Sequence, residues 1–326
     1  MPPSPTPDAL EATPAPAELE PAPEGLEPLV PGHNRISADR INLVFAPWGW
    51  DDPELFRRVA SVFVNWSGRA QLWGPDGLPL GVDDDASTAF EAEVGLFGIE
   101  PFRGHRDVFN VWVTAQSPTA PYDWLESTGT PVWAPDQVVV VLAEVDEAGL
   151  VASSVAGQGV MLTGLDAPRR AWDQPFANAT VAVNEDWVHS AMLDVPHELG
   201  HAMFGLADEY VGRRDGYDGF VRNPFWPSCA DTQERAESWW SQHVGQYDDQ
   251  VDYWAAEMTA AGFGPTAQEL DAMREQNRTA YVADGCFGVP GSVRSAEDTL
   301  MGFNFPAFGV TNRLWAEQVL ALWSGD

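Results

Sequence analysis

Lysine is absent from this chain of 326 residues, and arginine supplies all 17 of its basic side chains. Aspartate and glutamate number 49, so the formal net charge at pH 7 is −32. Binding the phosphate backbone of a nucleic acid requires clustered lysine and arginine. The composition therefore excludes nucleic acid as a partner and leaves neutral or basic molecules as better candidates.

Long hydrophobic runs and cysteines are also scarce. No apolar stretch approaches the roughly 20 residues that a membrane-spanning helix needs, so we expect no membrane span. The two cysteines, Cys229 and Cys286, can form one disulfide or remain as two buried thiols. The sequence favours neither state over the other, and it predicts no particular oligomeric state.

The first 35 residues are rich in proline, alanine and glutamate and nearly free of aromatic side chains. Such a segment buries too little apolar surface to offset its chain entropy, which predicts a disordered spacer over residues 1–35. The spacer lacks the basic start and apolar core of a signal peptide. Proline-rich spacers often precede the body of an exported protein, so we expect a secreted, cell-surface or periplasmic protein whose signal peptide is not in this chain.

The body of the chain shows strand patterns first and helix patterns later. Apolar runs rich in branched residues predict strands at 41–46, 109–113, 137–142, 157–162 and 180–183. Helical spacing predicts helices from about residue 52, over 187–204, and near 231–241, 266–278 and 311–323. Pro196 predicts a kink or a restart within the helix at 187–204. We therefore expect an α+β fold, with a mixed sheet and a central helix over residues 36–204 and a loop-rich, helical C-terminal lobe over 205–326.

The central helix carries the pattern His-Glu-x-x-His at residues 197–201. His197 and His201 are four residues apart, so both imidazoles leave one face of a helix and can bind one metal ion. In this pattern the histidines bind zinc, and Glu198 accepts a proton from the water that the metal activates. Two surface histidines on an amphipathic helix are the alternative. Apolar flanking residues predict a buried helix instead, where imidazoles need partners.

A catalytic zinc also needs a third protein ligand. Gly205 interrupts the helix pattern and Asp208 follows it by three residues, the relation that the metzincin pattern His-Glu-x-x-His-x-x-Gly-x-x-His keeps between its glycine and its third ligand. Here the glycine stands one residue further from His201, and the ligand is a carboxylate in place of a histidine. Asp208 is the first candidate, and Glu209 and a remote group are the alternatives.

The run from His197 to Tyr210, His-Glu-Leu-Gly-His-Ala-Met-Phe-Gly-Leu-Ala-Asp-Glu-Tyr, resembles the signature of the IgA-peptidase-like family of bacterial zinc metallopeptidases. Segments near 100–111 and 285–301 resemble other parts of that family, so the likeness extends in patches over residues 41–302. The resemblance implies a metzincin-like fold and a zinc endopeptidase that acts on proteins or peptides. Its implied zinc ligands are His197, His201 and Asp208.

Side chains outside the ligand set have candidate roles as well. The resemblance implies a methionine in a tight turn beneath the zinc, for which Met301 is the candidate. Tyr210 or Tyr217 can donate a hydrogen bond to the oxyanion that develops during hydrolysis. Acidic turns at 83–85 and 215–219 can bind Ca²⁺, although neither has the full ligand spacing of a known calcium loop.

Two other functions remain open from the sequence. One is a non-catalytic module that binds proteins or surfaces on the same scaffold, and the other is a metal-free structural protein. A pseudoenzyme commonly loses its base or a ligand, so the intact Glu198 favours the enzyme.

Overall fold

The computed structural model describes residues 22–34, 40–75, 78–81, 84–117, 137–144, 153–155, 160–162, 168–170, 177–183, 191–210, 227–286, 288–303 and 305–324. Several predictions fall outside these ranges: the spacer up to residue 21, the start of the central helix at 187–190, Tyr217, the acidic turn at 215–219, and residue 83 of the other acidic turn.

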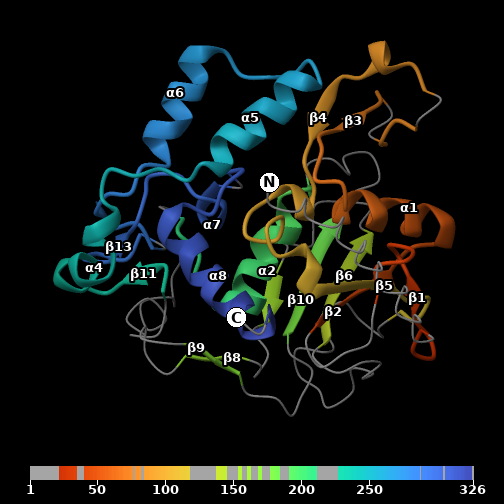
Figure 1. Cartoon of the computed structure of the whole chain (residues 1–326), viewed down its shortest axis with the longest axis horizontal. Helices are drawn as coiled ribbons and strands as arrows, with labels where there is room; N and C mark the ends of the chain where they lie inside the picture. The colour runs from red at the N-terminus through yellow and green to blue at the C-terminus, as the bar shows by residue number, and fades with distance from the viewer. Residues whose placement is uncertain are drawn as a thin grey trace, which may run out of the picture.

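A six-stranded sheet forms the centre of the fold (Figure 1). Its order is β1–β5–β2–β6–β10–β7, with β1 (Glu27–Pro28), β2 (Ile41–Trp48), β5 (Phe109–Val113), β6 (Gln137–Glu144), β7 (Ser153–Val155) and β10 (Ala177–Val183). The four central strands are parallel, and β1 and β7 run antiparallel at the edges. The mixed sheet and four of its predicted strands are thus confirmed.

The predicted strand at 157–162 does not join this sheet. Its apolar residues form β8 (Val160–Leu162), which pairs antiparallel with β9 (Pro168–Arg170) in a separate two-stranded sheet. The prediction that it completes the main sheet is wrong, and β7 occupies that edge. Apolar periodicity indicates a strand, but it does not say which partner the strand pairs with.

The end of the predicted spacer packs against the sheet. β1 pairs with β5, and Leu26 and Leu29 on either side of it are buried. Leu29 joins the main core, whereas Leu26 contacts the opposite face of the sheet. The spacer prediction is therefore too long at its C-terminal end, because these two leucines supply the apolar surface that the proline-rich part lacks.

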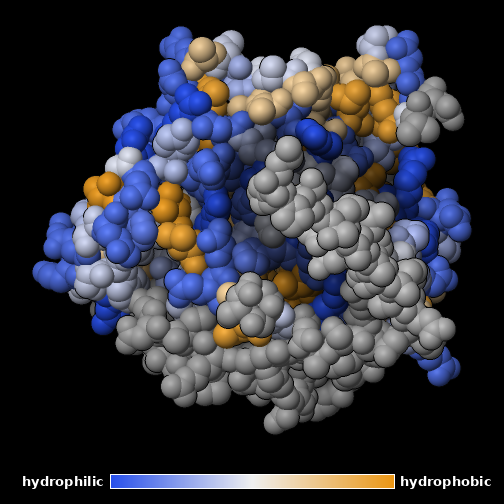
Figure 2. Space-filling model, in the orientation of Figure 1, coloured by the Kyte–Doolittle hydropathy of each residue, from blue (hydrophilic) through white to orange (hydrophobic). Residues whose placement is uncertain are grey.

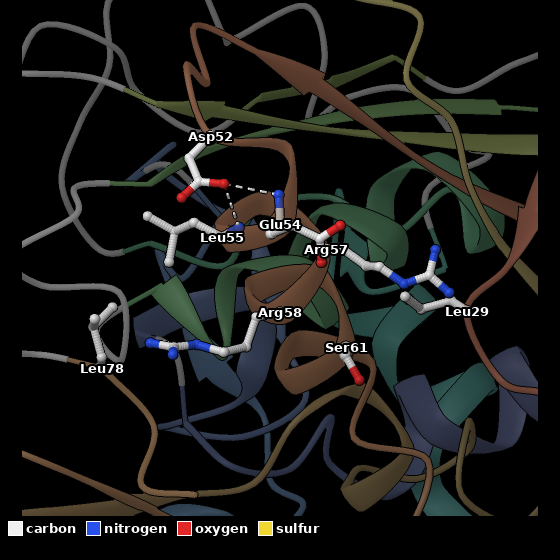
Figure 3. Close-up of a pocket in the computed structure, with 8 residues that line it drawn as sticks. All are labelled: Leu29, Asp52, Glu54, Leu55, Arg57, Arg58, Ser61 and Leu78. Carbon is white, nitrogen blue, oxygen red and sulfur yellow. Dashed lines mark hydrogen bonds between the residues drawn. The ribbon is translucent and has the colours of Figure 1, made fainter.

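Helix α1 (Pro53–Val64) confirms the helix expected from about residue 52. It begins at Asp52, whose carboxylate accepts hydrogen bonds from the backbone N–H groups of Glu54 and Leu55 (Figure 3). Pro53 occupies the first helical position, where its missing N–H removes no helical hydrogen bond. Aspartate at the cap and proline next to it together set the start of the helix.

Helix α2 (Asp194–Phe204) is the central helix, and it is shorter than the prediction of 187–204. Pro196 is its third residue. Backbone N–H groups in the first turn have no helical partner, so the proline neither breaks nor kinks the helix but marks its start. The helix ends at Gly205, whose φ of 62° is left-handed, as expected for a glycine that terminates a helix.

Both helices cover the same face of the sheet. Leu43 and Phe45 of β2 share a core with Phe56 of α1 and Leu199 of α2. The intervening Val44 points to the other face, because successive strand residues alternate. Helix α2 also lies against β10 and β7, so the His-Glu-x-x-His segment lies near the β7 edge of the sheet.

The C-terminal part is helical and loop-rich, as predicted. Its helices are α4 (Gln233–Trp240), α5 (Gln250–Ala260), α6 (Ala267–Gln276), α7 (Leu300–Phe303) and α8 (Val310–Ser324). A small sheet has the order β11–β13–β12, with β11 (Cys229–Ala230), β12 (Val282–Ala283) and β13 (Val293–Arg294), and a separate two-stranded sheet joins β3 (Gln71–Trp73) to β4 (Glu91–Glu93). The expected helices near 231–241, 266–278 and 311–323 correspond to α4, α6 and α8, whereas α5 was not predicted.

The two cysteines are joined as a Cys229–Cys286 disulfide, which resolves the alternatives that the sequence leaves open. Hydrophilic residues dominate the described surface in Figure 2, and hydrophobic ones form separate patches among them. In the part of the chain that the structure describes, no helix has the length and apolar character needed to cross a bilayer.

Candidate metal centre

Three side chains from α2 and the loop after it meet at one point. The Nε2 atom of His197 lies 3.1 Å from Oδ1 of Asp208, and Nε2 of His201 lies 3.0 Å from the same oxygen. The two Nε2 atoms are 3.1 Å apart. Ligand atoms at 2.0–2.1 Å from a tetrahedral zinc lie roughly 3.3 Å from one another, so this group has the spacing of a metal site.

Backbone carbonyl oxygens orient both imidazoles. Nδ1 of His197 lies 2.7 Å from the carbonyl oxygen of Leu300, and Nδ1 of His201 lies 2.6 Å from that of Leu206. A carbonyl oxygen only accepts hydrogen bonds, so we assign the proton of each neutral imidazole to Nδ1. Each Nε2 then presents a lone pair to the centre, as a metal ligand must.

With this assignment, all three atoms that face one another in the group are hydrogen-bond acceptors. With both imidazoles neutral, the two Nε2 lone pairs and the Asp208 carboxylate oxygen face one another with no proton between them. Three acceptors at this distance require either a cation or additional protons on the imidazoles. The group His197, His201 and Asp208 can therefore hold a metal ion.

The pKa of Asp208 follows from the same contacts. Burial raises the pKa of this carboxyl, but the contacts of Oδ1 with the imidazoles of His197 and His201 outweigh burial and hold the pKa well below its usual range. Asp208 is thus ionised and available as a ligand at neutral pH.

The loop after α2 is folded back so that Asp208 reaches the histidines. Gly205 turns the chain with its left-handed φ, and the Leu206 N–H donates to the Gly200 carbonyl. Further along, the Ala207 N–H donates to Oγ of Ser228 at 2.8 Å. The extra residue before Gly205, relative to the metzincin pattern, therefore does not carry Asp208 away from the site.

Glu209, the alternative third ligand, points away from the metal group. Its side chain is fully buried, with Oε2 accepting from Oγ1 of Thr299 at 2.8 Å and Oε1 accepting from Nδ2 of Asn312 at 2.7 Å. Burial raises the pKa of Glu209 to about 7, although these hydrogen bonds and Arg294 oppose the rise. The geometry brings Asp208 rather than Glu209 to the histidines.

Glu198 and Tyr210, the predicted base and oxyanion donor, are both neighbours of His197, the first in sequence and the second in space. Glu198 follows His197 directly in α2, and only 4% of it is exposed. The Tyr210 ring is stacked beside the His197 imidazole with 6.1 Å between ring centroids, and the residue is half-buried. The phenol is thus close to the metal group, whereas Tyr217 lies outside the described residues.

Met301 lies beneath the metal-bearing helix. It is fully buried in α7, and its sulfur sits so close to Gly200 that a Cβ added there would come within 2.6 Å of it. The preceding Leu300 supplies the carbonyl that orients His197. Residues 300 and 301 therefore pack against α2 in the helical turn that separates the two histidines.

Sequence reasoning missed the groups that hold these side chains in place. The carbonyls of Leu206 and Leu300 are backbone atoms, which no side-chain pattern reveals. Thr299 and Asn312 lie about a hundred residues from Glu209, at separations of 90 and 103. Nothing in the spacing of these residues along the sequence indicates that they meet.

An open cavity elsewhere does not involve the metal group. Its volume is about 600 Å³, and it lies over α1, where Leu29, Leu55, Arg58 and Leu78 contribute to its lining (Figure 3). None of the three metal-group side chains lines it. It is a separate surface feature.

Comparison with known proteins adds no family assignment. No protein-family model matches the chain, and no curated protein matches it. What the chain can do is therefore inferred from the residues of this centre.

Proposed function

We propose that this protein is a zinc-dependent endopeptidase in which Glu198 is the general base. One observation carries the proposal: Nε2 of His197, Nε2 of His201 and Oδ1 of Asp208 converge, with both Nδ1 atoms committed to carbonyl oxygens. The resemblance of residues 197–210 to the IgA-peptidase-like signature supports the same conclusion.

The donor set favours zinc over other common ions. Two imidazole nitrogens and one carboxylate oxygen are a usual ligand set of catalytic zinc, which keeps a fourth position for water. Calcium and magnesium prefer oxygen ligands alone.

When bound, zinc supplies a Lewis acid that polarises the scissile carbonyl and lowers the pKa of a water molecule to about 7. Glu198 would take a proton from the attacking water and pass it to the departing amine nitrogen. The half-buried Tyr210 beside His197 would donate a hydrogen bond from its phenol to the oxyanion. His197, His201 and Asp208 would hold the ion.

We also propose the β7 edge of the main sheet as the place for an extended peptide. Among the described strands of this sheet, β7 pairs with β10 alone, and it lies against α2. A peptide strand can add to the edge of a sheet through main-chain hydrogen bonds, which bind regardless of side-chain identity. Such binding fits an endopeptidase that acts on extended protein or peptide segments.

The Cys229–Cys286 disulfide supports the expected location outside the cytosol. Disulfides persist in oxidising compartments and are rare where thiols are kept reduced. We therefore propose that the enzyme acts as a secreted, cell-surface or periplasmic protein.

The test compares Glu198→Gln with the wild-type protein on a peptide library, with zinc measured by elemental analysis. Loss of the base should lower kcat roughly 10²–10⁴-fold while zinc remains stoichiometric. His201→Ala, a variant that lacks a ligand, should lose both zinc and hydrolysis.

Two results would overturn the proposal. If wild-type protein retains zinc but cleaves no peptide, the non-catalytic binding module is the better description. If the wild-type protein contains no zinc and binds none when it is supplied, the metal-free structural alternative stands.

A further inference from the structure

Glu209, in the loop that follows α2, makes hydrogen bonds with four residues of other segments. Its carboxylate accepts hydrogen bonds from Thr299 and Asn312, which stand before α7 and in α8. Its backbone N–H donates to the Met301 carbonyl at 2.8 Å, and its own carbonyl accepts from Nη1 of Arg294 at 2.8 Å. A single residue thus ties the loop to β13, to the Met301 segment and to α8.

Stability alone does not account for a carboxylate in this position. The side chain is completely buried, and removing a carboxyl group from water costs several kcal/mol unless its hydrogen bonds are satisfied. Apolar side chains of similar volume often replace buried ionic groups with no loss of stability. The retained hydrogen bonds instead specify one position of the backbone at residue 209.

That position determines where Asp208 lies. Residues 205–210 form no helix or strand, so contacts to other segments must hold them. Ser228 holds Ala207 on one side of Asp208, with bonds to both its N–H and its carbonyl, and the Glu209 contacts hold the other side. Asp208 is bracketed by two anchored neighbours.

We propose that Glu209 is a positioning residue that places the Asp208 carboxylate for metal binding by linking the loop to Thr299 and Asn312. This inference rests on the proposed zinc site. It assigns Glu209 no contact with substrate or metal, and its role is carried out through Asp208.

The experiment measures zinc affinity by competition with a chelator, and the visible absorption spectrum of the Co²⁺-substituted protein, for the wild type and three variants. Groups that orient metal ligands typically contribute 10–100-fold to metal affinity, so Glu209→Ala should bind zinc roughly 10–100-fold more weakly. Its Co²⁺ bands should shift as the ligand geometry changes. Glu209→Gln keeps the shape and can retain both hydrogen bonds, because the hydroxyl of Thr299 can accept as well as donate, and it should restore most of the affinity and the spectrum.

Asn110→Ala is the matched control. Asn110 is also fully buried, but it lies in β5 and donates to Asn42 within the sheet. Its loss should lower the melting temperature without changing zinc affinity or the Co²⁺ spectrum of the folded protein.

The outcomes separate this inference from the proposed function. If wild-type protein binds zinc and folded Glu209→Ala binds it equally, with an unchanged Co²⁺ spectrum, the positioning role is wrong while the zinc site stands. If Glu209→Ala does not fold, Asn312→Ala, which removes one of the two side-chain links, must show a smaller loss of affinity in the same direction. If the wild type binds no zinc, both the function and the inference fall.

Discussion

At the scale of single residues, the metal group depends on backbone atoms as much as on side chains. The carbonyls of Leu206 and Leu300 orient the two imidazoles, and the Met301 carbonyl holds Glu209. Every residue has a backbone carbonyl, so substituting the side chain of residue 206, 300 or 301 does not remove the hydrogen-bond acceptor. The orientation of the ligands is therefore sensitive to the path of the chain and less sensitive to the identity of the residues that supply the carbonyls.

A different carboxylate, Glu93 in β4, predicts a pH-dependent stability. Burial and the neighbouring negative charge of Glu91 raise the pKa of Glu93 from 4.5 to about 7. Between these values the folded protein retains a proton that the unfolded chain releases, so the stability that the proton confers is lost as pH rises through about 7. Glu93→Gln should therefore raise the free energy of unfolding by about 3 kcal/mol at pH 8 and have little effect at pH 4.5.

Denaturant unfolding of both proteins at several pH values checks this prediction. Glu91→Gln serves as a companion variant, because removing its charge should lower the pKa of Glu93 and move the pH dependence to lower pH. An equal effect of Glu93→Gln at pH 8 and at pH 4.5 would show that titration of this group is not the cause.

At the scale of elements, Gly200 is the position at which α2 packs closely against the segment that contains Met301. A Cβ at Gly200 would lie 2.6 Å from Sδ of Met301 and 2.9 Å from a ring carbon of Phe308. Alanine favours a helix over glycine, but overpacking of a close-packed core typically costs 1–3 kcal/mol. We expect Gly200→Ala to be destabilising by about 1–3 kcal/mol and to weaken zinc binding, because α2 must shift.

Thermal unfolding and zinc titration measure both effects. The double variant Gly200→Ala/Met301→Ala relieves the sulfur contact and should recover part of the zinc affinity. Stabilisation by Gly200→Ala would mean that helix propensity outweighs the contacts with Met301 and Phe308.

The elements themselves were largely predictable from sequence, for a physical reason. Strand β5 was predicted at its observed bounds because a run of branched and aromatic residues lies between turn residues. Helix α5 is not predicted because two of its five buried residues, Gln250 and Glu257, are polar, so its apolar stripe is weak. The start of α2 differs from the prediction because Pro196 is tolerated in the first turn of a helix.

The site was only half predictable. The spacing of His197 and His201 on one helix predicts two candidate ligands, and the turn at Gly205 predicts a third, Asp208, which the structure brings beside them. The supporting contacts join residues about a hundred positions apart, and such pairings arise from tertiary packing, which a single sequence does not display.

At the scale of the whole molecule, the disulfide closes a loop of 57 residues that contains most of the C-terminal helices. On the loop-entropy model, a bond closing such a loop contributes about 4 kcal/mol. The double variant Cys229→Ser/Cys286→Ser should therefore unfold at a markedly lower temperature, and reduction of the wild type should have the same effect. Calorimetry under oxidising and reducing conditions measures the shift, and the double variant should be insensitive to reductant.

The disulfide also touches the metal loop, since Sγ of Cys229 lies 3.7 Å from the carbonyl oxygen of Asp208. Equal melting temperatures with and without the bond would indicate that packing alone holds this part of the molecule.

The position of the Leu300 carbonyl has a consequence for biosynthesis. Polypeptides are made from the N-terminus, so α2 and the loop after it are synthesised well before the C-terminal part. At that stage the chain already contains His197, His201 and Asp208, but it lacks the segments around Leu300 and Asn312 that orient them. The candidate metal centre thus lacks these contacts until the chain up to about residue 312 has been synthesised, so a chain terminated before that point carries the three side chains without the contacts that hold them.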